Sequence, residues 1–370
     1  MYKRSNDELE SLTFGQRLGL INRIISASDS KLSVRRILRE LRPEIVHVHN
    51  TFAMVSPSVY KVCQEEGVPV VQTLHNYRLL CPAATFYRTG APCEECVTHS
   101  LLRSVRYGCY RESRVMSGAI ALMLKTHRSR QTWSRQIDAY IAISSFVKDK
   151  FVQAGFPASK IFVKPNFVDP DPGEGCNSGD YVLFLGRLSP EKGLLTLLQA
   201  WERLPSAVPL VIAGDGPMRH SLEAEVARKQ LRSVHFAGQL KRSEGYEAMK
   251  KAAFLVVPSV WDEPFGVVVA EAFACGTPVL GAFTGAIQEM LDDQVSGVHF
   301  APGDPDALAK SVTWAWGHSR ELVAMGKAGR RVYQERYTAK ANYDLLMNIY
   351  ATAIDTHHRS KRERSLRAAA

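Results

Sequence analysis

The sequence predicts an α/β protein made of two domains, each built around a parallel β-sheet. Short apolar, β-prone runs alternate with amphipathic or capped helical stretches in both halves of the chain, which is typical of a parallel sheet covered by helices. Residues 166–180 are rich in proline, glycine and small polar residues, which indicates a linker between the domains. A chain of 370 residues is long enough to form two hydrophobic cores.

The first predicted domain covers residues 1–165. Its apolar runs predict strands at 45–49, 69–73 and 139–143. An amphipathic helix is expected at 32–41, and a second helix is expected to begin with Ser56 as its N-cap and to end at Gly67. A third helix should follow the strand at 139–143.

The second predicted domain covers residues 181–336 and repeats the alternation of strand and helix. Its first strand is expected at 181–185, and a buried strand is expected in the run that starts at Phe254. Residues 337–357 are predicted to form a helix that crosses back to the first domain. The polar, basic segment 358–370 is expected to be disordered.

A segment with two glutamates, Glu263 and Glu271, is the most informative part of the chain. Between them, a turn marked by Pro264 and Gly266 leads into an apolar helix, which we expect to begin near Phe265. The backbone N–H groups of Phe265, Gly266 and Val267 would then be free to bind an anion at the positive end of the helix. The two carboxylates would accept hydrogen bonds from sugar or ribose hydroxyls, so the segment suits a nucleotide-sugar.

A second loop supplies positive charge. Gly186 and Arg187 follow the strand at 181–185, and Lys192 lies just before the next expected helix. A guanidinium matches phosphate oxygens with two parallel donors, and an ammonium offers a compact charge. The alternative is that both cations form ordinary surface ion pairs in a solvated loop.

Together these motifs resemble the retaining GT-B glycosyltransferases of family four. That family carries a G-R-x-x-x-x-K-G loop followed by an E-x7-E motif, and the resemblance covers nearly all of residues 181–355. It implies two Rossmann-like domains with parallel sheets that face each other across a cleft. It also implies roles for individual residues: diphosphate contacts from Arg187 and Lys192, a sugar contact from Glu263, ribose contacts from Glu271, and donor contacts from Gly186, Gly238, Asn166 and the backbone at 265–267.

The first domain carries one further candidate for catalysis. His75 follows the strand at 69–73, and active sites of α/β sheets lie at the carboxyl ends of strands. The resemblance implies that His75 lines the cleft and contacts the donor sugar; the alternative is a histidine packed in a loop. Only one amphipathic helix precedes residue 45, so the first domain is expected to be incomplete relative to that family.

Four cysteines lie in a long insertion predicted at residues 76–115. Cys93 and Cys96 have a C-x2-C spacing, and Cys81 and Cys109 flank them. Four thiolates would complete a tetrahedral structural zinc site. Free or redox-labile thiols and disulfides are the alternatives.

The composition bounds location and partners. The formal net charge is +10, and no apolar run approaches the roughly 18 residues that a membrane span requires. With a polar, charged N-terminus, a cytoplasmic protein is expected. Residues 103–135 hold eight Lys and Arg against one Glu around an apolar segment, which favours either an element at an anionic membrane surface or a buried helix with a solvated basic flank. No nucleic-acid motif is present.

The expected function is transfer of a sugar from a nucleoside diphosphate sugar to a glycan or lipid-linked acceptor, with retention of configuration. Two Asp-x-Asp pairs lie in the linker and at a helix start, away from the expected site, so no metal is expected to take part in catalysis. The alternatives are a GT-B sugar-nucleotide epimerase and a catalytically impaired fragment that only binds nucleotide-sugars.

Overall fold

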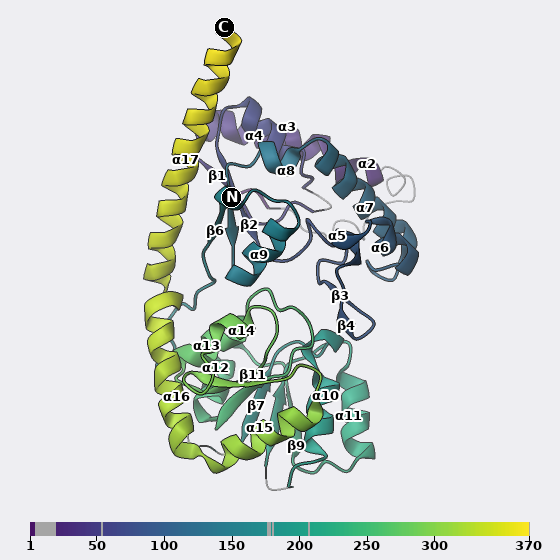
Figure 1. Ribbon diagram of the computed structural model, residues 1–370, viewed down its shortest axis with the longest axis vertical. Helices are drawn as coiled ribbons and strands as arrows, with labels where there is room; N and C mark the ends of the chain where they lie inside the picture. The colour runs from purple at the N-terminus through teal and green to yellow at the C-terminus, as the bar shows by residue number, and fades with distance from the viewer. Residues whose placement is uncertain (4–19, 53–54, 176–178, 180, 206–207, 370) are drawn as a thin grey trace. The chain divides into compact units, whose positions relative to one another are not determined.

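The computed structural model describes residues 1–3, 20–52, 55–175, 179, 181–205 and 208–369 (Figure 1). The chain divides into two compact units. The first unit comprises Met1–Phe86, Cys93–Lys164 and Asp344–Ala370, and the second comprises Tyr87–Pro92 and Pro165–Tyr343. Each unit is an α/β structure around a parallel sheet, which confirms the predicted fold class.

The first unit contains a four-stranded parallel sheet with the order β1-β2-β5-β6. Three of its strands lie within one residue of the predicted positions: β1 (Val46–Val48), β2 (Val70–Leu74) and β5 (Ala139–Ala142). The fourth strand, β6 (Ile161–Val163), was not predicted. All residues of β2 and β5 are buried, as expected for central strands covered on both faces. The helices of this unit include α2 (Leu20–Ile25), α3 (Ser28–Leu41), α4 (Val59–Glu65), α7 (Arg114–Ser129), α8 (Thr132–Arg135) and α9 (Ser145–Gln153).

The start of α4 corrects one prediction. Ser56 is not the N-cap of this helix, because its hydroxyl accepts a hydrogen bond from the backbone N–H of Ala27 at 2.8 Å. Ser58 precedes the helix instead, and its own hydroxyl lies 2.6 Å from that of Ser56. Ser56 therefore ties the start of α3 to the start of α4.

The second unit contains a six-stranded parallel sheet with the order β12-β11-β10-β7-β8-β9. If the strands are numbered along the chain within this unit and the sheet is read from β9 to β12, the order is 3-2-1-4-5-6. This is the arrangement of a doubly wound nucleotide-binding fold. The strands are β7 (Val182–Leu185), β8 (Leu210–Ala213), β9 (Val234–Gly238), β10 (Phe254–Val257), β11 (Val279–Ala282) and β12 (Gly297–Phe300). The helices are α10 (Leu194–Trp201), α11 (Arg219–Arg228), α12 (Arg242–Lys251), α13 (Val267–Ala274), α14 (Ile287–Met290), α15 (Pro305–Gly317) and α16 (Ser319–Val332).

The long C-terminal helix α17 runs over Ala339–Ala369. The hydroxyl of Thr338 accepts a hydrogen bond from the N–H of Ala341 and so caps its start. Ile349 and Ala353, one turn apart, pack with Val71 and Ile141 of the first unit's sheet. The prediction that residues 358–370 are disordered was wrong, since the helix continues to residue 369. The segment favours a helix because it contains no glycine or proline and is rich in good helix formers.

The cysteine-containing insertion consists of short elements. A hairpin of β3 (Tyr87–Arg88) and β4 (Ala91–Pro92) is followed by α5 (Glu95–Thr98) and α6 (Leu102–Tyr107). In α7, which comes next, most of the apolar run is buried, although Val115 and Leu122 remain 74% and 47% exposed. Burial of one face of α7 favours the alternative of a packed helix with a basic flank.

Candidate functional site

The loops that follow β7 and β10 are neighbours, because these two strands pair with each other in the sheet. On one side of this pair the sheet continues with β8 and β9, and on the other side with β11 and β12. This is the topological switch point, where α/β sheets of this order bind ligands. Gly193 brings the two loops into direct contact: it has φ +72°, and a Cβ there would lie 1.8 Å from the carbonyl oxygen of Pro258. The N–H of Val260 also donates to the carbonyl of Glu191 at 3.0 Å. The β7 and β10 loops thus form one surface.

An ion pair between Lys192 and Glu263 lies at the centre of this surface. The Lys192 Nζ is 3.0 Å and 2.8 Å from the two carboxylate oxygens of Glu263, which is only 8% exposed. Ser259 Oγ and Trp261 Nε1 also donate to Glu263 Oε2, at 3.2 Å and 2.9 Å. The sequence predicted separate roles for Lys192 and Glu263, but not that one would neutralise the other.

Arg187 is the exposed cation of the β7 loop. It is exposed, and within the described part of the chain it forms no ion pair. With Lys192 paired to Glu263 and the Glu191 carboxylate bonded to the Ser189 hydroxyl at 2.6 Å, the Arg187 guanidinium stays available to a ligand. An anion that bound here would meet Arg187 directly and could also draw Lys192 away from the carboxylate.

The start of α13 lies two residues later than predicted. The helix begins at Val267 with Gly266 as its N-cap, and the N–H of Val267 is bonded to the carbonyl of Phe265 at 3.2 Å. Of the three predicted anion donors, Val267 is therefore already occupied in this conformation. A Cβ at Gly266 would lie 2.9 Å from Val269 Cγ2, so the tight entry into the helix needs glycine.

Glu271 lies on α13 and is largely buried. Burial raises the pKa of its carboxyl, partly opposed by the nearby Arg242 guanidinium and by Tyr246. The Arg242 Nε lies 3.8 Å from Glu271 Oε1. The Glu271 carboxylate is thus a partly buried hydrogen-bond acceptor, with the Arg242 guanidinium nearby.

Three glycines lie close together at the carboxyl ends of the neighbouring strands β7, β8 and β9. Gly186 follows β7, and a Cβ on Gly214 would lie 1.9 Å from the carbonyl oxygen of Gly186. The N–H of Gly214 donates to the carbonyl of Gly238 at 2.7 Å, so Gly186 and Gly238 are linked through it. Asn166 is half-buried in the segment before the second sheet, and no contact among the described residues joins it to Glu263 or Lys192.

The first unit gathers a separate cluster of histidines at the carboxyl ends of β1 and β2. His75 Nε2 lies 2.8 Å from His49 Nδ1, and the rings of His47 and His49 are stacked with centroids 4.3 Å apart. His47 also contacts the hydroxyls of Thr73 and Tyr350, each at 2.7 Å. Burial, the neighbouring His49 and Lys164 lower the pKa of His75 from 6.5 to about 4, so it is neutral near pH 7.

Lys164 is a residue of this cluster that the sequence reasoning missed. It directly follows β6 and is 9% exposed, and burial lowers the pKa of its ammonium to about 8. The signal was present in the sequence, since Lys164 follows an apolar strand as His49 and His75 do. The predicted catalytic set is divided between the units: His75 belongs to the first, and Arg187, Lys192 and Glu263 belong to the second.

The four predicted zinc ligands are not arranged as a metal site. In the described ranges, no three His, Cys, Asp or Glu side chains are placed to hold a metal ion. All four cysteines are free thiols. Cys81, Cys93 and Cys109 lie near enough to Cys96 to add to the effect of burial, which raises the pKa of the Cys96 thiol to about 12. Zinc binding stays a prediction.

None of the helices in the part of the chain that the structure covers has the length and apolar character of a membrane span.

Two family models match the chain, one over each half. The model described as Glycosyltransferase Family 4 matches residues 15–172, and that described as Glycosyl transferases group 1 matches residues 176–332. The second range contains the β7 and β10 loops with Arg187, Lys192 and Glu263.

Curated relatives and solved structures agree with these two matches. The chain is 30% identical to O-antigen chain mannosyltransferase C of Escherichia coli over 179 residues, which are 48% of this chain and 48% of that protein, so the match spans about half the relative's length. It is 29% identical to the glycogen synthase of Mycobacterium tuberculosis over 285 residues, covering 74% of this chain and 60% of that one. Its fold matches that of Anabaena Alr3699/HepE in complex with UDP-glucose, with a TM-score of 0.65 and 20% identity, covering 87% of this chain and 82% of that one.

Proposed function

We propose that the chain is a glycosyltransferase of the GT-B type that moves a sugar from a nucleoside diphosphate sugar to a glycan or lipid-linked acceptor, with retention of anomeric configuration. The observation that carries the proposal is the joined surface of the β7 and β10 loops. It presents the exposed Arg187 in the same loop as Lys192, which is paired with Glu263, at the switch point of the sheet.

The donor in this proposal is a UDP-sugar or GDP-sugar. A solved structure with a similar fold holds UDP-glucose, which supports the uridine form. The diphosphate would bind Arg187 and Lys192, and the N–H of Gly266 would meet the distal phosphate. Glu271 would accept hydrogen bonds from the ribose hydroxyls.

Catalysis in this scheme rests on stabilising the leaving diphosphate. The bond between the anomeric carbon and the phosphate oxygen breaks, and a bond to the acceptor oxygen forms on the same face of the sugar. The acceptor proton passes to the departing phosphate oxygen. Negative charge grows on the diphosphate as the bond breaks, and Arg187 and Lys192 would stabilise it without a metal ion.

Glu263 has two roles in this scheme. Before the donor binds, it holds Lys192 in place through both carboxylate oxygens. Once Lys192 turns to the diphosphate, the carboxylate is free to accept hydrogen bonds from the sugar. His75, neutral at pH 7, is proposed as a further catalytic residue.

The acceptor belongs to cell-surface polysaccharide or glycolipid synthesis in this proposal. The match to an O-antigen chain mannosyltransferase supports this choice. Action at the inner face of the cell membrane is part of the same proposal and rests on the lipid-linked nature of such acceptors.

The proposal is tested by measuring UDP and GDP binding by calorimetry, and then transfer from UDP-glucose and GDP-mannose to lipid-linked acceptors. Arg187→Gln should weaken binding of the preferred nucleotide roughly tenfold or more, as expected for the loss of a charge-assisted contact. Arg232→Gln, which removes an exposed arginine elsewhere in the same unit, is the matched control. Equal affinities for both variants would reject the site.

Three outcomes separate the alternatives. Transfer that persists in EDTA supports the metal-independent scheme. Conversion of the donor sugar without any acceptor would indicate an epimerase. Nucleotide binding without transfer or conversion would indicate a protein that only binds nucleotide-sugars.

A further inference from the structure

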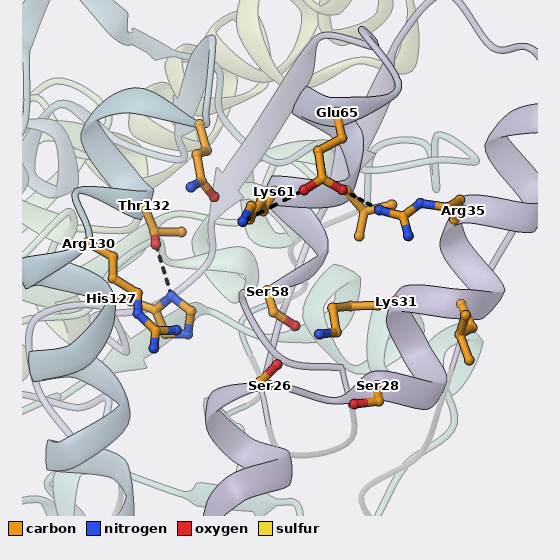
Figure 2. A pocket seen from close by; sticks show the side chains of 13 residues that line it. Ser26, Ser28, Lys31, Arg35, Ser58, Lys61, Glu65, His127, Arg130 and Thr132 are labelled. Atoms are coloured by element: carbon orange, nitrogen blue, oxygen red, sulfur yellow. Dashed lines mark hydrogen bonds and ion pairs between the residues drawn. The ribbon is translucent and has the colours of Figure 1, made fainter.

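A cavity of about 430 Å³ lies in the first unit, among residues that the proposed reaction does not use (Figure 2). Its walls come from the start of α3, from α4, and from the segment that joins α7 to α8. Thirteen residues line it: Ser26, Ser28, Lys31, Leu32, Arg35, Ser58, Lys61, Val62, Glu65, His127, Arg130, Thr132 and Gln136. None of them belongs to the histidine cluster. The volume falls in the range of roughly 300–1,000 Å³ typical of small-molecule sites.

The charge of the lining is strongly unbalanced. It carries four cations, Lys31, Arg35, Lys61 and Arg130, against one carboxylate, Glu65. Glu65 forms an ion pair with Arg35 and lies 3.7 Å from Lys61. Figure 2 shows these three side chains meeting at one end of the cavity.

Lys31 and Arg130 remain without an acidic partner in the described part of the chain. Lys31 extends from α3 toward Ser58, and Arg130 lies beside His127 (Figure 2). The nearest acid of α3, Asp29, is already engaged by Arg23 at 2.7 Å. The two cations therefore leave a positive potential that nothing in these walls offsets.

Neutral hydrogen-bond donors complete the walls. The hydroxyls of Ser26, Ser28 and Ser58 face the cavity near Lys31 in Figure 2. The start of α3 adds little to this charge, because the Asp29 carboxylate already accepts a hydrogen bond from the N–H of Ser30 at 2.9 Å. His127 is fixed by Thr132 at 2.9 Å and by the carbonyl of Ile25 at 3.0 Å, so this wall is rigid.

We propose that this cavity binds a phosphate-bearing anion, with Lys31 and Arg130 as its principal charge contacts and the serine hydroxyls as neutral donors. A cation on a flexible stem together with a planar guanidinium and several hydroxyls suits phosphate or diphosphate oxygens. The ligand is either a soluble phosphorylated compound or the phosphate of a lipid headgroup. The site lies outside the donor loops and does not depend on the proposed transfer reaction.

Calorimetric titration with inorganic pyrophosphate tests the site. The titration is run in the Arg187→Gln background, so that the donor loops contribute little to the heat. Lys31→Gln and Arg130→Gln are each expected to weaken binding roughly tenfold. The matched control is Arg36→Gln, which also removes one cation from α3; Arg36 is 73% exposed, pairs with Glu40 at 3.9 Å and does not line the cavity.

A second arm identifies the source of the phosphate. Sedimentation with phosphatidylcholine vesicles that contain phosphatidylglycerol is compared with sedimentation with phosphatidylcholine alone. Loss of selective pelleting in Lys31→Gln and Arg130→Gln, but not in Arg36→Gln, would indicate a lipid headgroup; pelleting that is absent, or equal in all variants, would indicate a soluble ligand. The proposal is overturned if pyrophosphate does not bind at millimolar concentration, or if all three substitutions change its affinity equally while thermal melts show folded protein.

Discussion

Replacing Lys192 by methionine tests the joined loops most informatively, because it affects stability and donor binding in different ways. The change leaves the Glu263 carboxylate, whose side chain is 11% exposed, with only Ser259 and Trp261 as donors among the described residues. Removing one partner of a fully buried pair costs roughly 3–5 kcal/mol. Because the Lys192 side chain keeps 24% exposure and solvent screens the pair, we expect a loss of about 2 kcal/mol.

A double-mutant cycle isolates the pair. Glu263→Gln keeps the shape of the side chain and removes its charge, so Lys192→Met combined with Glu263→Gln should regain about 1 kcal/mol relative to the sum of the single changes. Urea unfolding followed by tryptophan fluorescence suits this measurement, because Trp201, Trp261, Trp314 and Trp316 of the five tryptophans lie in the second unit. Single changes that add within about 0.5 kcal/mol would show that the two groups are not coupled.

The same variants separate structure from donor binding. Lys192→Met should weaken nucleotide diphosphate binding by roughly tenfold, whereas Glu263→Gln should leave it unchanged or strengthen it, because Lys192 is released. Calorimetry with UDP and GDP measures both effects. If Lys192→Met destabilises the protein but binds the nucleotide as the parent does, the lysine serves only Glu263, and its assignment to the diphosphate is refuted.

Three further predictions address other parts of the chain. Gly193→Ala should destabilise the second unit by at least 1 kcal/mol, since a Cβ would meet the Pro258 carbonyl at a positive φ, and an unchanged urea midpoint would contradict this contact. The pKa values of His47 and His75 are both lowered from 6.5 to about 4, so between these pH values the unfolded chain binds more protons than the folded protein. Stability should therefore fall as the pH drops from about 6.5 to 4. His75→Asn should flatten this dependence in thermal melts at stepped pH. Zinc binding would require the four thiols to draw together around the ion, and metal analysis of the purified protein tests it: one zinc per chain, lost in Cys93→Ser together with Cys96→Ser but kept in Cys275→Ser, would establish the site, and metal-free protein would leave the thiols without this role.

The strands and the site loops could be predicted from the sequence because their signals are local. Apolar runs that end in glycine or polar residues placed β7 and β10 within two residues of their ends, and Arg187, Lys192 and Glu263 lie in the loops that follow. What could not be predicted is the pairing of Lys192 with Glu263. These residues are 71 positions apart, and their contact depends on the fit of Gly193 against Pro258, which only the folded sheet creates.

The errors at helix ends have local causes too. The segment after His358 is basic and polar, which is typical of a disordered tail, yet the same residue types favour a helix once α17 is anchored by Ile349 and Ala353. The sequence predicts Phe265 as the start of α13, but its side chain is buried, with its ring 5.8 Å from that of Tyr337. That packing holds Phe265 outside the helix, which starts two residues later.

A crystal structure of the protein with bound UDP tests the central claim most directly. The account predicts diphosphate oxygens within about 3 Å of the Arg187 guanidinium and of the Lys192 ammonium, with Glu271 facing the ribose. A diphosphate bound away from the β7 and β10 loops, with Lys192 still paired to Glu263, would contradict it.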